Sequence, residues 1–321
     1  MINTMLHFIG CDISKADFYA AFEENEDALK FINDREGVGV FMNQIKKKGF
    51  KKNDTIIGME STGFYHILLS LLCKKEGYEV RIINPLITSK QNKVNLRRVK
   101  TDPKDAKLIR FCTVKGEGYP FLETEDTLKI KALVRQRDYM AHLKAQLNLK
   151  QQALSHREHC ILMPITQMNL ELNEMISIKM KELDKELALQ SKDLQKLLRS
   201  IPGVGPQTAI TLISEVGNIH RFSTSKKLTA FLGLDSRTHQ SGTSILGKGF
   251  ITKRGNKLLR TRLFNAASSA VLRPNLFQAF FLKKRSEGKH YMVALIATMH
   301  KMVHVIHAVW KRETPFVQEK K

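Results

Sequence analysis

Two aspartates three residues apart, Asp102 and Asp105, stand in the otherwise basic stretch VKTDPKDAKLIR at residues 99–110. Proline favours the first position of a helix, so Pro103 predicts a helix that Asp102 caps and whose first turn contains Asp105. Acids near a helix N-terminus are ordinary stabilisers, and capping by itself explains the pair. A catalytic role would require further carboxylates from elsewhere in the chain and a reason for their charges to converge.

Two further acids stand where predicted strands end. Asp12 lies at or near the end of the first strand, in IGCDISK, and Glu60 ends a later strand, in GMES. Because catalytic groups commonly collect at the carboxyl ends of strands in α/β sheets, these acids are expected to converge with Asp102 and Asp105 on one site. Four carboxylates so close would repel each other strongly. Two Mg²⁺ ions would relieve that repulsion and could hold a phosphodiester between them.

Strands and helices alternate around these acids. The pattern predicts a strand, a short turn and a second strand over residues 5–23. Further along, it predicts helices at 35–48 and 61–77 and strands at 55–61 and 78–85. Such alternation is typical of an α/β domain, which we place at residues 1–120.

The middle of the chain, residues 121–200, is nearly free of glycine and has helical periodicity. Apolar residues recur every seven positions at Leu133, Met140, Leu147 and Leu154. A second run has the four-three spacing of a heptad seam: Ile176, Met180, Leu183, Leu187, Leu194 and Leu197. The two runs predict two long coiled-coil helices that either fold back as a hairpin or pair with another subunit. We favour the oligomer and interpret the region as a dimerisation segment.

The charge of the chain points to a polyanionic partner. Its 321 residues include 53 Lys and Arg and 31 Asp and Glu, which gives a formal net charge of +22. Residues 201–321 contribute most of the excess, with 20 basic and five acidic residues. Nucleic acid is the first expectation for such a partner and an anionic membrane the second.

Cysteine spacing and the last apolar run limit the remaining classes. The four cysteines form no CxxC pair, which is typical of a cytoplasmic protein and argues against a zinc ribbon. They are Cys11, Cys73, Cys112 and Cys160. The apolar run at 291–310 contains Lys301 and three histidines, so we predict a buried or interfacial helix instead of a membrane span. The histidines share one helical face without carboxylate or cysteine partners, which disfavours a zinc site: His300, His304 and His307.

After Ser200 the sequence predicts a mainly α-helical domain at residues 201–321. The stretch IPGVGPQTA at 201–209, with Gly203 and Gly205, has the small-residue turn of a helix-hairpin-helix. Backbone N–H groups of such a turn and of the following helix can donate to a phosphate. A tight interhelical turn without a ligand is the alternative, and the basic excess favours DNA.

The stretch QSGTSILGKGFITKRGNKLLRTRLF, residues 240–264, combines hydroxyls, glycines and cations. The cations are Lys248, Lys253, Arg254, Lys257, Arg260 and Arg262. A serine that attacks DNA needs room around its Oγ and donors for the charge that develops on the phosphate. Ser241 is followed by Gly242, which allows close backbone approach. Composition alone leaves Ser236, Ser241, Thr243 and Ser244 open as nucleophiles, and it favours a loop that binds RNA or DNA.

In both halves the chain resembles a group of bacterial insertion-sequence transposases. These proteins carry a DEDD domain of the RuvC-like, RNase H fold first and a serine-bearing transposase domain last. The first half matches as GCDISK, GMESTG and KTDPKDA, and the second at Ser241-Gly242, Gly249, Ile251, Lys253, Gly255-Asn256 and Leu259-Arg260. One departure is Gly233-Leu234-Asp235-Ser236, because the family usually has a proline shortly after the Gly-Leu. The resemblance covers essentially the whole chain.

The resemblance implies an RNA-guided recombinase. A structured bridge RNA would pair with donor and target double-stranded DNA, leaving shape and backbone recognition to the protein. The protein would need Mg²⁺ held by Asp12, Glu60, Asp102 and Asp105, and would form a 5′-phosphoserine link through Ser241. Dimers would assemble into a tetramer with composite active sites, in which the acids of one subunit act with the serine of another. The nucleic-acid contacts would be Lys100, Lys104, Gly203, Gly205, Lys248, Lys253, Arg254, Lys257 and Arg260.

Two other functions fit parts of the pattern. A structure-specific nuclease resembling a junction resolvase would use the four carboxylates with water as nucleophile, and would form no protein–DNA adduct. A non-catalytic nucleic-acid-binding protein would use neither site for chemistry. The covalent adduct therefore separates the recombinase from both alternatives.

Overall fold

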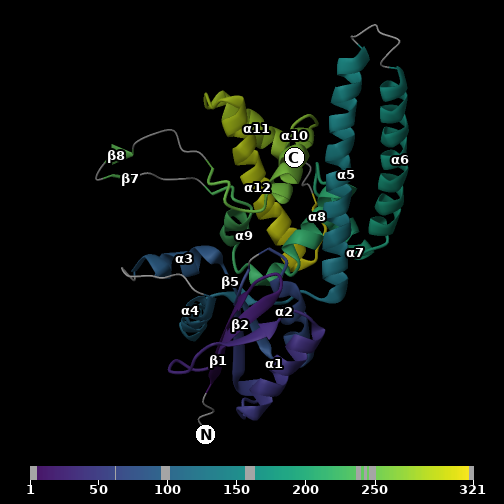
Figure 1. Cartoon of the computed structure of the whole chain (residues 1–321). Coiled ribbons are helices and arrows are strands. Elements are labelled where there is room, and N and C mark those ends of the chain that lie inside the picture. The colour runs from purple at the N-terminus through teal and green to yellow at the C-terminus, as the bar shows by residue number, and fades with distance from the viewer. Residues whose placement is uncertain are drawn as a thin grey trace. The chain divides into compact units, whose positions relative to one another are not determined.

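The computed structural model describes residues 6–61, 63–94, 102–155, 163–235, 240–241, 244–245 and 251–317, with only the backbone described at 92–94, 155, 163, 240–241 and 244–245. It divides into two compact units, Met1–Glu125 and Asp126–Lys321 (Figure 1). Lys100 and Lys248, two of the predicted nucleic-acid contacts, lie outside the described residues.

The first unit is built on a six-stranded mixed sheet in the order β3-β2-β1-β4-β5-β6. Strands β1, β4 and β5 run parallel, whereas β2, β3 and β6 pair antiparallel with their neighbours. The strands are β1 (His7–Ile13), β2 (Asp17–Ala21), β3 (Leu29–Ile32), β4 (Thr55–Glu60), β5 (Glu79–Ile83) and β6 (Tyr119–Pro120). The helices are α1 (Arg35–Lys47), the 3₁₀ turn η1 (Lys52–Asp54), α2 (His66–Lys75), α3 (Pro85–Val94) and α4 (Asp102–Val114). The predicted α/β character of this region is confirmed.

The two faces of the sheet are covered by different helices. Alternate residues of β1 and β4, among them Ile9 and Cys11, pack in one buried core with Phe41 of α1 and Leu69 of α2. The residues between them face the other way, toward α4. A Cβ at Gly10 would lie 2.1 Å from the backbone nitrogen of Arg110, so α4 sits directly on the backbone of β1.

Gly10→Ala is expected to lower the free energy of unfolding of the first unit by about 1–3 kcal/mol. The added methyl would meet the backbone of α4, which cannot give way as a flexible side chain can. Denaturant unfolding of wild type and variant measures the change. The matched control is Gly39→Ala in α1, where an added Cβ meets nothing within 4 Å, and which should leave stability equal or slightly raised. Equal destabilisation by both changes would contradict the close packing of α4 on β1.

In its described residues, the second unit is mainly helical and has one short strand pair. Its helices are α5 (Glu125–Ser155), α6 (Met163–Ala188), α7 (Lys192–Arg199), α8 (Pro206–Val216), the 3₁₀ turn η3 (Ile219–Arg221), α9 (Ser225–Phe231), α10 (Lys257–Ala270), α11 (Leu276–Ser286) and α12 (Tyr291–Arg312). Strands β7 (Gln240–Ser241) and β8 (Ser244–Ile245) pair antiparallel. Helices α7 to α12 share one buried core, to which α12 contributes eight residues.

Helices α5 and α6 lie antiparallel beside each other (Figure 1). Arg137 of α5 pairs with Asp184 of α6, and further along the helices Lys144 donates to Ser177. The predicted seam on α6 is half-buried or buried within the chain, and Leu187 joins a small core with Val134 of α5. Of the two arrangements that the sequence allows, this seam therefore serves the hairpin. Its coiled-coil packing stays a prediction.

Helix α12 is long and apolar enough to span a membrane by length and composition alone. Its buried residues, however, face the other helices of the second unit, in contact with α9, α10 and α11. Of the two predicted possibilities, a buried or an interfacial helix, these contacts support the buried one.

Candidate active site and nucleic-acid interface

Strand pairing brings Asp12 and Glu60 together. β1 and β4 are parallel neighbours in the register Cys11↔Met59, so the next residue on each strand is one of the two acids. Side chains alternate along a strand, and Cys11 and Met59 point into the core under α1 and α2. Asp12 and Glu60 therefore point to the opposite face, which α4 covers, and both are half-buried at the carboxyl ends of their strands.

The other two predicted acids lie in the first turn of α4. The helix begins at Asp102 itself, so both Asp102 and Asp105 are helical residues. The residue before the helix, Thr101, lies outside the described part of the chain. Asp102 is exposed and Asp105 half-buried. Asp102 is thus the first residue of the helix and not the predicted N-cap, a difference within the ordinary uncertainty of helix ends.

Strand register places Asp12 beside Glu60, and one helical turn places Asp102 near Asp105. Among the described residues, no group of three or more His, Cys, Asp or Glu side chains is close enough to hold a metal ion. The donor set nevertheless suits one, because carboxylate oxygens are the ligands that hard divalent cations prefer. The pair at Asp12 and Glu60 offers two such groups on adjacent strands of one face.

Glu60 has a fixed orientation. The hydroxyl of Thr88, a buried residue of α3, donates to its Oε2 at 2.8 Å and also lies 2.9 Å from the carbonyl of Pro85. The neighbouring thiol of Cys11 stays neutral, because burial raises its pKa and the Asp12 carboxylate raises it further. No feature of the sequence marked Thr88 as a partner of Glu60.

Backbone hydrogen bonds join residues 231–235 to residues 251–256 at the two ends of the segment that carries Ser241. We call these two stretches of residues the neck. Thr252 N–H donates to Asp235 O at 2.8 Å, Lys253 N–H to Gly233 O at 3.0 Å, and Asn256 N–H to Phe231 O at 3.0 Å. Ser241 pairs with Ser244 across the short strands β7 and β8. Its side chain lies outside the description.

Two glycines allow the halves of the neck to approach. Gly233 has φ +65°, and a Cβ there would lie 2.4 Å from the backbone nitrogen of Gly255. A Cβ at Gly255 would in turn lie 2.2 Å from the nitrogen of Gly233. Arg260 secures this crossing, since it donates to Leu232 O at 2.9 Å and to Gly255 O at 3.4 Å. The stretch that lacks the proline usual in the resembled family, residues 233–236, therefore begins inside the neck.

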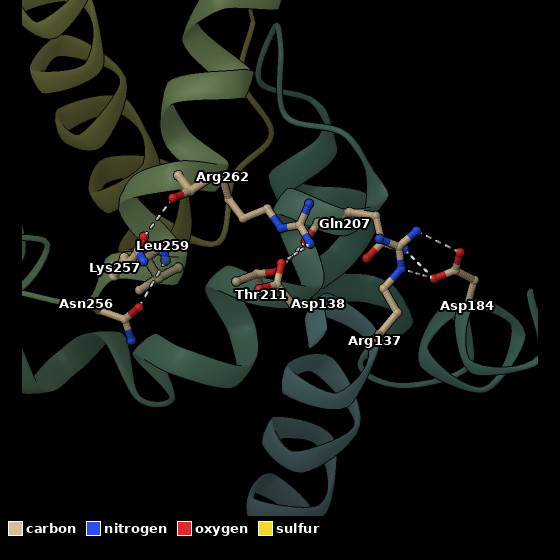
Figure 2. Close-up of polar contacts among 10 residues, drawn as sticks. Arg137, Asp138, Asp184, Gln207, Thr211, Asn256, Lys257, Leu259 and Arg262 are labelled. Atoms are coloured by element: carbon tan, nitrogen blue, oxygen red, sulfur yellow. Dashed lines mark hydrogen bonds and ion pairs between the residues drawn. The ribbon is translucent and has the colours of Figure 1, made fainter. Parts of the chain in front are cut away.

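The described cations near the neck divide into two groups. Lys253, Arg254 and Lys257 are exposed, as is Lys104 in the first unit, and a phosphate could reach each of them. Arg260 serves the neck. Arg262 donates to Asp138 of α5 at 2.9 Å, and burial lowers its pKa from the usual value of arginine (Figure 2). The roles of the first group and of Arg260 in binding nucleic acid stay predictions.

The predicted helix-hairpin-helix is a tight turn between α7 and α8. Gly203 has φ +87°, and a Cβ there would lie 2.3 Å from Ala266 O of α10, so packing alone requires glycine. Gly205 stands at the N-cap of α8 with open space around its Cβ position. The structure thus has a turn between two helices here, while the helix-hairpin-helix motif and its contact with DNA stay predictions.

The sequence did not predict the polar cluster where α5, α6, α8 and α10 meet. Arg137 of α5 and Gln207 of α8 both donate to Asp184 of α6. Next to this group, Arg262 of α10 donates to Asp138 of α5 (Figure 2). Beside this cluster, Glu215 of α8 accepts from Arg135 of α5 and from Asn256 of the neck. A single acid in the apolar sequence ITLISEV was the available signal for Glu215.

The three histidines of α12 are hydrogen-bonded to protein. His300 Nε2 lies 2.8 Å from Leu234 O, His307 Nε2 lies 2.9 Å from Phe222 O, and His304 Nδ1 lies 2.7 Å from Ser225 Oγ. They bind the segment that leads into the neck and form no metal cluster within the described ranges.

Comparison with known proteins gives two family matches. A model described as a DEDD transposase of the IS110 type matches residues 9–156, and one described as Transposase IS116/IS110/IS902 family matches residues 195–282. The pilin gene-inverting proteins of Moraxella bovis and Moraxella lacunata are each 29% identical over 322 residues, covering 96% of this chain and 97% of theirs. The transposase for insertion sequence element IS1111A of Coxiella burnetii is 36% identical over 135 residues, 41% of this chain and 36% of its own.

Proposed function

Because the chain belongs to the IS116/IS110/IS902 family of insertion-sequence transposases, we propose that it is a bridge-RNA-guided recombinase with a serine nucleophile. It cuts and rejoins DNA in the bacterial cytoplasm. The observation that carries the proposal is the pairing of β1 with β4, since it places Asp12 and Glu60 at adjacent strand ends in the region matched as a DEDD transposase. Two relatives named for inverting a pilin gene support rejoining as well as cutting, because inversion requires both.

Asp12, Glu60, Asp102 and Asp105 would hold divalent metal, which we expect to be Mg²⁺. The chemistry supplied by the bound metal is neutralisation of these carboxylates and polarisation of the scissile phosphate. Thr88 keeps Glu60 oriented through its hydroxyl. Asp102, exposed at the start of α4, or Asp105 can accept a proton from the serine hydroxyl.

Ser241 attacks the phosphorus of the scissile phosphodiester. A bond forms between its Oγ and phosphorus, the bond from phosphorus to the 3′ oxygen breaks, and the strand leaves with a 3′ hydroxyl. The 3′ hydroxyl of another strand then attacks the 5′-phosphoserine and releases the serine. The exposed cations Lys253, Arg254 and Lys257 flank this segment and would hold the phosphates in place.

The guide would be a structured RNA encoded beside the gene. The formal charge of +22 suits a complex that holds RNA together with donor and target duplexes. Base pairing would select the sequence, while exposed lysines and the turn at Gly203 and Gly205 would contact backbone phosphates.

A tetramer of two dimers would bring the acids of one subunit to Ser241 of another. Helix α6 exposes a stripe of apolar residues on a face other than the hairpin seam: Ile165, Met168, Leu172 and Met175. Their three-four-three spacing is that of a helix-pairing seam. We expect this stripe to pair with a second copy of the chain.

The decisive experiment is detection of a covalent protein–DNA adduct on a denaturing gel. Purified protein is mixed with labelled element-end DNA, RNA transcribed from the flanking sequence, and Mg²⁺ or EDTA. We expect an adduct that requires the metal. Trypsin should then release the peptide 238–248 carrying nucleotide, and fragmentation should place the modification on Ser241 instead of Thr243 or Ser244. Metal-dependent cleavage without any adduct would replace the recombinase by a nuclease that uses water.

A further inference from the structure

Glu215 is a buried acid that joins three parts of the second unit. It lies in the last turn of α8, and its side chain is only 2% exposed. An isolated carboxylate there would be strongly disfavoured, so its partners are structurally important. Both oxygens are engaged, one by a single donor and the other by two.

The first partner is Arg135, which reaches inward from α5. Its Nε donates to Oε1 of Glu215 at 2.7 Å and its terminal nitrogen to Oε2 at 3.0 Å. This two-point contact fixes the plane of the carboxylate, as arginine forks do. The Arg135 side chain is 41% exposed, so it connects the surface of the helical hairpin to the buried acid.

The second partner is Asn256, at the end of the neck. Its Nδ2 donates to Oε2 of Glu215 at 2.8 Å, its Oδ1 accepts from Leu259 N–H at 3.0 Å, and its own backbone N–H donates to Phe231 O (Figure 2 shows the Leu259 contact). The cap of α10 does not by itself require asparagine, because aspartate and serine cap equally well. Only the contact with Glu215 uses the amide as a donor.

We propose that Glu215 is a positioning residue for the segment that carries Ser241. It acts through Asn256, which it holds at the point where the neck ends and α10 begins. Because Arg135 fixes the other side of the same carboxylate, the position of α5 is transmitted to the neck. A contact of the helical hairpin with nucleic acid or with a second copy of the chain would thus change the position of the segment that carries Ser241. The inference rests on the proposed serine chemistry.

The test is a donor–acceptor reversal at Glu215 and Asn256. Asn256→Asp keeps the cap of α10 but places a second carboxylate next to Glu215. Glu215→Gln removes the negative charge to which both Arg135 and Asn256 donate. In the double variant, the new amide can donate to the new carboxylate, which restores the contact. We expect each single variant to slow single-turnover adduct formation by about 10- to 100-fold at saturating DNA, as loss of an orienting partner does, with DNA affinity unchanged. The double variant should recover to within about tenfold of wild type.

Hydrogen exchange at the amides of Thr252, Lys253 and Asn256 gives a second readout. Each single variant should lose protection from exchange at these amides, and the double variant should regain it. Asn256→Ser keeps the cap but is too short to reach Glu215. It should slow adduct formation and lower neck protection as Asn256→Asp does, although it adds no charge. The matched control is Asn275→Asp, because that residue caps α11 while its Nδ2 donates only to the main-chain carbonyls of Ala270 and Arg273. It should leave the adduct rate and neck protection unchanged.

The outcomes separate this inference from the proposed function. If wild type forms no adduct, the serine chemistry fails, while reversal of neck protection would still establish Glu215 as the residue that positions the neck. If folded single variants keep wild-type adduct rates and neck protection, or if the double is no better than the singles in both readouts, Glu215 is not a positioning residue.

Discussion

Ser241→Ala is expected to eliminate the covalent protein–DNA adduct and to slow strand transfer by about 10⁴-fold or more. Loss of a nucleophile removes the reacting atom itself, and in other enzymes it costs up to about 10⁶-fold. DNA and RNA affinities should stay within about twofold of wild type, because a hydroxyl on one serine contributes little to binding of a polyanion by many cations. Gel detection of the adduct, with filter binding in parallel, measures both.

Ser244→Ala is the matched control for this change. Ser244 is the cross-strand partner of Ser241 in the β7–β8 pair, so both changes remove a hydroxyl from the same short hairpin. The control should retain the adduct at close to the wild-type rate. Loss of the adduct in Ser244→Ala, with Ser241→Ala active, would move the nucleophile to Ser244. Equal loss of the adduct in both variants would indicate that the β7–β8 pair is disturbed. Faster hydrogen exchange at the neck amides would reveal such a disturbance.

Local pattern predicted most of the framework. Alternation and turn residues located β1, β2, β4 and β5, and heptad spacing located the helical hairpin. The short strands β3 and β6 and the helices α3 and α11 were not predicted, because four or fewer strand residues, or a helix with mixed polarity, leave little periodic signal. The choice between hairpin and intermolecular pairing also needed the structure, since a heptad seam describes a partner helix without saying which chain it comes from.

The candidate site was predicted in part for a similar reason. A strand end can be read from sequence, so Asp12 and Glu60 could be paired in advance, but the register that aligns them is a tertiary property. Thr88, Arg135 and Glu215 act through contacts between residues 28 to 80 positions apart, and no local spacing encodes them. Arg260 and Arg262 looked like two more cations of a basic run, whereas their hydrogen bonds bind the neck and α5.

Asp12→Asn and Glu60→Gln should each lower the rate of adduct formation by about 10³-fold while leaving nucleic-acid affinity nearly unchanged. Each change keeps the shape of the side chain but replaces an anionic oxygen ligand with a weaker neutral one, so the transition-state charge is less well balanced. The Mg²⁺ concentration for half-maximal rate should rise in both variants. A binding isotherm for Mn²⁺, followed by electron paramagnetic resonance, gives a readout that does not depend on turnover.

Asp17→Asn provides the control for these two acids. Asp17 lies on β2 of the same sheet, but its carboxylate is held by Lys30 and Ser14, which lower its pKa, and it is not among the four predicted ligands. Its replacement removes a partly exposed ion pair, which contributes little to stability, and should leave the rate and the metal requirement as in wild type. If Asp12→Asn and Glu60→Gln matched this control, the pairing of β1 with β4 would be structural only. Asp102 and Asp105 would then have no carboxylate partners on the sheet, and the proposed metal site would be wrong.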